Sequence, residues 1–110
     1  MNKIIEQYRP KDGSTRSLLR AMYNLLKDPK HWTQHVFAMT KDGHYTKFDH
    51  KNACSWCLVG SYRALSDNGA QRNRAINKIY EEIGCASSLA GFNDTNSHET
   101  VIKMLKKVKG

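Results

Sequence analysis

The segment 52–65 constrains the fold of this chain more than any other stretch. Its apolar and small side chains recur at the spacing of one helical face, and Asn52 can cap the N-terminus of such a helix. We therefore predict a buried helix from Asn52 to about Ser66. Thiols at a helix start lie near unpaired N–H groups, where their pKa can fall. The residues that share the predicted buried face are Cys54, Cys57, Leu58, Ser61 and Leu65.

Three further stretches have the period of amphipathic helices. The first begins after Ser14 or Thr15 as a cap and stops at Asp28-Pro29, because a residue before proline avoids helical dihedrals. The second runs from about Ala70 to Gly84, and the last from about Ser97 to Val108. The apolar positions that define these helices are Leu18, Leu19, Met22, Leu25, Leu26, Ala75, Ile76, Ile79, Tyr80, Ile83, Val101, Ile102, Leu105 and Val108.

Between the first two helices the period changes to that of a strand. Residues 34–40 and 45–49 are β-like, and Asp42-Gly43 between them is typical of a tight hairpin turn. A lone hairpin is marginal in water, so it should pack on the helices. Residues 1–13, with the breaker Pro10, are expected to form a flexible N-terminal arm, followed by a single globular domain over 14–110. The predicted fold class is α+β, mainly α, with about four helices packed with one β-hairpin.

Composition limits the function classes. The net charge of +8 leaves nucleic acid, a nucleotide or another acidic partner open, although the basic residues are spread along the chain. Three cysteines are an odd number, which argues against a secreted disulfide framework. No apolar run approaches the roughly 20 residues of a membrane span, and the N-terminus lacks a signal-peptide core. A cytoplasmic protein without a membrane partner is expected.

An ordered series of residues over roughly 32–108 has the pattern of a known family: Trp32, Ala38, Asp42, Gly43, Ala53, Trp56, Cys57, Leu58, Val59, Gly60, Arg63, Ala64, Ile83, Gly84, Phe92, Asn93, Asp94, Glu99 and Val101. This combination resembles a small family of uncharacterised domains met in phages, prophages and actinobacteria. Two positions depart from the family's usual pattern, since Phe92 replaces a tryptophan and Ser61 an alanine; Cys54 and His98 are not fixed features of it. The resemblance brings no known activity and implies a small phage accessory protein made in the infected cell.

Cysteine chemistry is one candidate activity. Cys57 or Cys54 could act as the nucleophile, His98 as the base, and Asn93 or Asp94 as the orienting group, in the chain order of papain-like enzymes. A domain of this size leaves little room for a triad and a substrate cleft. The Cys54-x-x-Cys57 spacing also occurs in dithiol redox motifs, but no βαβ frame surrounds it.

A zinc site is the second chemical alternative. His50, Cys54 and Cys57 offer three ligands that Cys85 or His98 could complete. A structural zinc site usually draws its ligands from two pairs, and the chain has no second pair. We therefore expect neither a metal nor a cofactor.

The polar pair Asn93-Asp94 can be read in two ways. It can cap the last helix or close an Asx turn before it, or it can contact a ligand there. Trp32 is either a packing aromatic or a stacking platform for a base or partner. The candidate binding residues are thus Trp32, Asn93 and Asp94. The preferred hypothesis is a non-enzymatic phage accessory protein that binds a host protein, with a small cysteine hydrolase and a nucleic-acid or nucleotide binder as alternatives.

Overall fold

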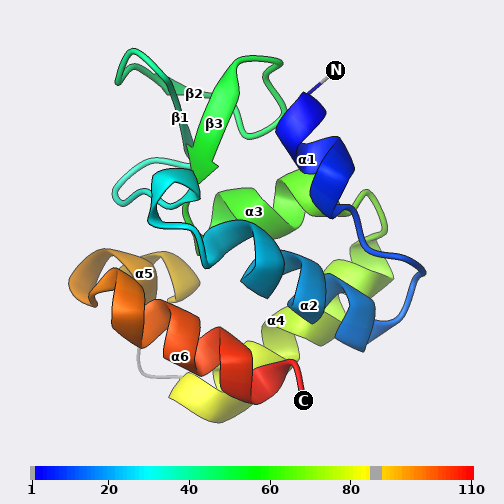
Figure 1. Ribbon diagram of the computed structural model, residues 1–110. Coiled ribbons are helices and arrows are strands. Elements are labelled where there is room, and N and C mark those ends of the chain that lie inside the picture. The colour runs from blue at the N-terminus through cyan, green and yellow to red at the C-terminus, as the bar shows by residue number, and fades with distance from the viewer. Residues whose placement is uncertain (1, 85–87) are drawn as a thin grey trace.

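In the computed structural model, which describes residues 2–84 and 88–110, six α-helices pack together and a small antiparallel sheet lies at one end of the molecule (Figure 1). This architecture confirms the predicted mainly helical α+β class, with more helices and one more strand than expected. The elements are α1 (Lys3–Tyr8), α2 (Thr15–Leu26), β1 (Ala38–Thr40), β2 (Tyr45–Thr46), β3 (Ala53–Trp56), α3 (Leu58–Leu65), α4 (Gly69–Ile83), α5 (Leu89–Thr95) and α6 (His98–Val108).

Helix α2 is the centre of the core. Ser14 caps it by accepting a hydrogen bond from the Ser17 N–H, as the sequence predicts. One face is polar, while the other packs against α3, α4 and α6, which lie around it in Figure 1. Its buried residues are Leu18, Leu19, Ala21, Met22, Leu25 and Leu26. The predicted helices over α4 and α6 are also present, so strong helical periodicity located three helices correctly.

The sheet has the strand order β2-β1-β3. Strands β1 and β2 form the predicted hairpin, and Gly43 in its turn has φ of 83°, a left-handed conformation that favours glycine. Strand β3 overturns part of the predicted second helix, because residues 53–56 pair with β1. A short apolar run does not distinguish a strand from a helix. Here residues 53–56 form a strand because they pair with the edge of β1 that β2 does not occupy. Helix α3 therefore begins at Leu58, with Cys57 rather than Asn52 as its cap.

The N-terminal segment contains regular structure where a flexible arm was expected. Residues 3–8 form α1, which buries Ile5. The side-chain amide of Asn2 donates to the carbonyl oxygens of His50 (3.0 Å) and Ala53 (2.7 Å). These contacts join the segment to the chain around β3. A helix of six residues has little stability of its own, so its packing partners hold it in place.

The segment before the last helix is also helical. Ser88 caps α5 and Ser97 caps α6, each by accepting a hydrogen bond from a backbone N–H three residues later. Asn93 and Asp94 consequently lie inside α5 and do not cap α6, which corrects the capping interpretation of this pair. None of the helices described has the length and apolar character needed to span a membrane.

Candidate functional site

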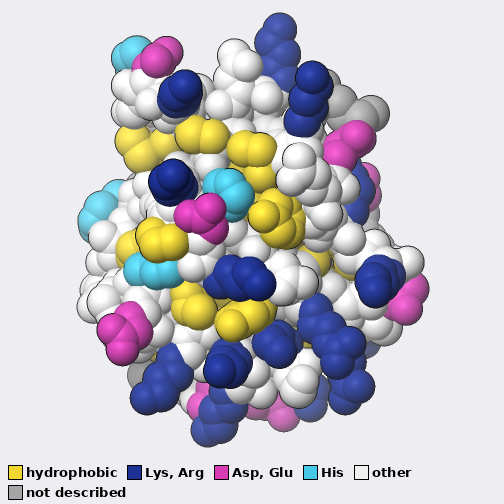
Figure 2. Space-filling view, in the orientation of Figure 1, with side chains coloured by type: hydrophobic (Ala, Val, Ile, Leu, Met, Phe, Trp, Pro, Cys, Tyr) yellow, Lys and Arg dark blue, Asp and Glu magenta, His cyan; other side chains and the backbone are white. Residues whose placement is uncertain are grey.

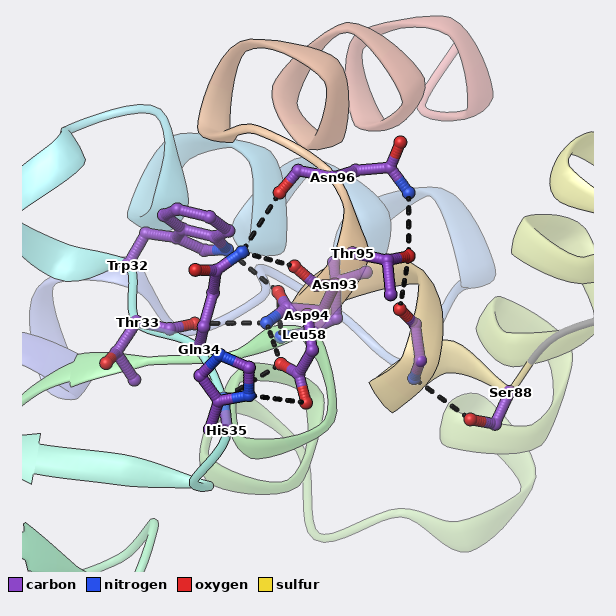
Figure 3. A network of polar contacts seen from close by, with 11 residues as sticks. Trp32, Thr33, Gln34, His35, Leu58, Ser88, Asn93, Asp94, Thr95 and Asn96 are labelled. Atoms are coloured by element: carbon purple, nitrogen blue, oxygen red, sulfur yellow. Dashed lines mark hydrogen bonds and ion pairs between the residues drawn. The ribbon is translucent and has the colours of Figure 1, made fainter.

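Asn93 lies at the centre of a polar network that joins three segments of the chain (Figure 3). Its Oδ1 accepts hydrogen bonds from the Trp32 indole N–H (2.8 Å) and the Leu58 backbone N–H (3.1 Å). Its Nδ2 donates to the Thr33 carbonyl (3.0 Å) and to Asp94 Oδ1 (3.0 Å). Because the side chain is fully buried and all of its hydrogen-bonding capacity is used, Asn93 has a structural role.

Asp94 holds the adjoining loop. Its Oδ1 accepts a hydrogen bond from the backbone N–H of His35 at 2.8 Å, and its Oδ2 lies 3.7 Å from His35 Nδ1. Among the residues with described coordinates, His35 alone has a positive φ without being glycine, at 72°. This left-handed conformation is uncommon outside glycine. The Asp94 carboxylate therefore stabilises a backbone geometry that the loop would otherwise adopt only at a cost.

A pocket of about 310 Å³ opens beside this loop, between the β1–β2 hairpin and α5. Two of its residues, Tyr45 and Phe37, are 79% and 46% exposed and are large hydrophobic side chains left open to solvent. Figure 2 shows hydrophobic side chains at the surface over the strands. The lining residues are His35, Val36, Phe37, Tyr45, Thr46, Cys57, Ala90 and Asp94.

Gly60 allows the loop to lie directly against α3. An added Cβ at this position would overlap the carbonyl oxygen of Phe37. The same oxygen accepts a hydrogen bond from the Cys57 N–H at 3.2 Å, which ties Phe37 to the start of α3. The glycine in the Trp-Cys-Leu-Val-Gly string is thus explained by a close approach of two backbones.

Cys57 forms part of the pocket wall and is only 4% exposed, which confirms its predicted burial. Its Sγ accepts a hydrogen bond from the Gly60 N–H at 3.3 Å and thereby caps α3. Burial raises the pKa of this thiol above its ordinary value, the nearby Asp94 charge adds to the increase, and the Gly60 hydrogen bond opposes it only in part. Cys57 is therefore held in its neutral form, the opposite of an activated helix-start thiol.

The structure separates the histidine of the proposed triad from this pocket. His98 Nε2 lies 2.7 Å from the Leu26 carbonyl oxygen, and its ring packs on Trp32 with centroids 5.3 Å apart. The histidine that lines the pocket with Cys57 and Asp94 is instead His35. Sequence reasoning missed His35, because only its left-handed backbone and its contact with Asp94 distinguish it.

The other cysteine candidates are also separated. Cys54 is a half-buried residue of β3, whereas Cys57 caps α3, so the two thiols do not share one helix start. Within residues 2–84 and 88–110, no group of three or more His, Cys, Asp or Glu side chains could hold a metal ion. Cys85, one of the two residues considered as a fourth zinc ligand, lies outside the described residues.

A comparison with models of protein families finds a match over most of the chain. The model of a family described as "Family of unknown function (DUF6197)" matches residues 10–109, which is nearly the whole chain. No curated protein and no solved structure matches the chain.

Proposed function

The chain belongs to the DUF6197 family, and we propose that it is a non-enzymatic binding protein that holds an apolar side chain of a protein partner in the pocket beside Phe37 and Tyr45. The observation that carries this proposal is the combination of an apolar hollow with two exposed aromatic side chains at its edge. Binding surfaces favour tyrosine and phenylalanine, since they bury much apolar area at little cost in side-chain entropy.

The pocket is also preorganised. Asn93 donates to the Thr33 carbonyl and Asp94 accepts from the His35 N–H, which holds the 33–35 segment in place. Gly60 lets Phe37 sit on the start of α3. A wall that is already ordered loses little conformational entropy when a partner binds. The guanidinium of Arg63 lies 5.5 Å from the Phe37 ring and supplies a cationic group at the rim. A partner segment with one apolar residue next to an acidic one fits this arrangement.

The proposed setting follows from the resemblance of the sequence to phage and prophage domains. In that setting the protein is a small phage accessory protein, and its partner is a host protein in the host cytoplasm. Small size and a pocket whose thiol is held neutral are the features that support binding over catalysis.

Crosslinking from the pocket tests the proposal. A photoreactive phenylalanine analogue placed at Tyr45 should crosslink one protein in host lysate. Tyr45→Ala and Phe37→Ala should each weaken the purified complex at least about tenfold, since aromatic side chains of this kind act as binding hot spots.

The matched control is His44→Ala, which removes an exposed neighbour on the same hairpin that does not line the pocket. It should change the Kd by less than about threefold. Equal binding by the wild-type protein and the Tyr45→Ala variant would place the interaction elsewhere on the protein.

The second candidate is the cysteine hydrolase, in a form that only the structure suggests. Cys57, His35 and Asp94 line one pocket, and Asp94 contacts His35 through its side chain. In this scheme His35 takes the thiol proton, and Cys57 Sγ attacks the acyl carbon of a thioester and expels its thiolate, which takes that proton from His35. Water then cleaves the acyl–Cys57 bond, which releases the free acid and restores the thiol. The raised pKa of Cys57 opposes the scheme.

Activity on simple thioesters separates the two candidates. A hydrolase loses turnover in both Cys57→Ser and His35→Gln, whereas a binding protein shows no turnover above buffer in any form. Cys57→Ser is the suitable variant, because serine can keep the cap of α3.

A further inference from the structure

A second hollow lies away from this pocket. It has a volume of about 630 Å³ and runs between residues 7–11, at the end of α1, and the outer face of α2. None of its lining residues lines the pocket beside Tyr45. We refer to it as the α1–α2 groove.

The groove is strongly basic. Arg9, Lys11, Arg20 and Lys27 line it, all four are exposed, and no aspartate or glutamate is among the lining residues. In the part of the chain that the structure describes, no salt bridge joins any of these four to an acid. Two acids directly follow groove cations in sequence, and both are engaged locally: Asp12 accepts hydrogen bonds from the Ser14 N–H (2.9 Å) and the Ser17 hydroxyl (2.7 Å), and Asp28 accepts one from the Lys30 N–H (3.0 Å). The four cations are therefore available to an anionic ligand.

The positive charge is arranged as a row. Arg16, Arg20 and Lys27 recur at helical spacing along the solvent side of α2, over about 16 Å. Near the end of the row, Lys27 and Lys109 both lie over the Tyr23 ring, with each Nζ within 6 Å of its centroid. Figure 2 shows Lys and Arg side chains gathered over α2 and α6 in the lower half of that face. A row of this length can meet several phosphates in turn, whereas a free phosphate would use only part of it.

The groove also contains an aromatic ring and amides. Tyr8 lines it together with Gln7 and Asn24. Single-strand-binding proteins combine a basic groove, which follows the backbone, with aromatic side chains on which bases stack. An acidic peptide would use the cations but would gain nothing from a stacking ring. We propose that the α1–α2 groove binds single-stranded nucleic acid, with its phosphates on Arg9, Lys11, Arg20 and Lys27 and a base against Tyr8.

Fluorescence anisotropy with a labelled single strand of about 12 nucleotides tests this proposal, since that length matches known single-strand sites. Arg20→Gln with Lys27→Gln should weaken binding at least about tenfold. The double variant should also lower the slope of log K against log salt by about 1.4, because each phosphate contact on a single strand contributes about 0.7. Both side chains are exposed, so the fold should be kept, as circular dichroism can verify.

The matched control removes two charges elsewhere. Lys103→Gln with Lys106→Gln takes the same charge from exposed positions of α6 that do not line the groove. This control should keep its affinity within about threefold. Tyr8→Leu should weaken binding about tenfold without changing the salt slope, because stacking is not electrostatic. If Tyr8→Leu fails to fold, the comparison of the two double variants still tests whether the groove binds the strand.

Three results would overturn the proposal. The first is an absence of binding at low salt. The second is an equal loss of affinity in the groove double variant and in the control double variant. The third is equal or tighter binding of duplex DNA or of poly-glutamate of matched charge, which would assign the groove to a duplex or to acidic protein segments. The groove and the Tyr45 pocket share no lining residue, so failure of one proposal leaves the other intact.

Discussion

Trp32 and Asn93 are 61 residues apart in sequence, and the indole N–H of Trp32 donates to Asn93 Oδ1 at 2.8 Å. The same oxygen accepts the backbone N–H of Leu58, so one buried amide joins the segment after α2, the start of α3, and α5. The pocket beside Tyr45 owes its shape to this junction, because the loop that forms its wall follows directly from Trp32 and Thr33.

Replacing Asn93 should destabilise the whole domain. Asn93→Ala leaves the Trp32 N–H, the Leu58 N–H and the Thr33 carbonyl without this partner in a buried site. Leaving buried polar groups unpaired costs about 1–3 kcal/mol each, and local rearrangement recovers part of it, so we expect a loss of about 2–4 kcal/mol in urea unfolding. Asn77→Ala, at an exposed position of α4, should change stability by less than about 0.5 kcal/mol. Similar stabilities of the two variants would contradict the structural role of Asn93.

Two glycines offer a matched test of the close approach at α3. Gly60→Ala should lower the free energy of unfolding by about 1–3 kcal/mol, because its Cβ would displace Phe37. Gly69→Ala meets no atom within 4 Å and should be neutral or slightly stabilising, since alanine favours helices. Thermal unfolding of both variants measures the difference. A Gly60→Ala protein as stable as Gly69→Ala would show that the loop does not rest on α3.

Asp94 should contribute to stability through the loop and not through a helix cap. Asp94→Ala removes the acceptor for the His35 N–H and for Asn93 Nδ2, and we expect a loss of about 1–2 kcal/mol. Asp94→Asn keeps one carbonyl oxygen and should lose less. Thermal melts of the two variants check this order, and the reverse order would mean that the charge near His35 matters more than the hydrogen bonds.

Cys57 should be the less reactive of the two described cysteines. Because burial raises its pKa, the thiol stays neutral near pH 8, and iodoacetamide should modify Cys54 much faster in the folded protein. Peptide mapping by mass spectrometry measures both rates in one sample, so Cys54 serves as the internal control. Faster modification of Cys57 would favour the hydrolase.

The same shift predicts a pH dependence of stability. The folded state holds the Cys57 proton more tightly than the unfolded state does. Its contribution to stability is therefore complete below the unfolded pKa and is lost as the pH rises through the folded pKa. The free energy of unfolding of the wild-type protein, measured with urea, should fall as the pH rises above about 8.5, the ordinary pKa of a thiol. The Cys57→Ser variant should show a smaller fall. Equal declines would assign the effect to other groups.

Local pattern in the sequence determined the three long helices and the β1–β2 hairpin. Their apolar spacing, caps and the Asp42-Gly43 turn are features of adjacent residues, which a chain carries before it folds. The burial of Cys57 followed from the same spacing, although the residue proved to be a cap and not an interior helical position.

Only the tertiary structure decided the short elements and the candidate site. Helix α1, strand β3 and helix α5 have four to seven residues each, too few for a period to identify them, and their packing and pairing partners decide their conformation. The left-handed backbone of His35, the close approach at Gly60 and the hydrogen bonds of Asn93 to Trp32, Thr33 and Leu58 depend on segments that are far apart in sequence. Such contacts exist only once the core has brought those segments together, so no local pattern in the sequence specifies them.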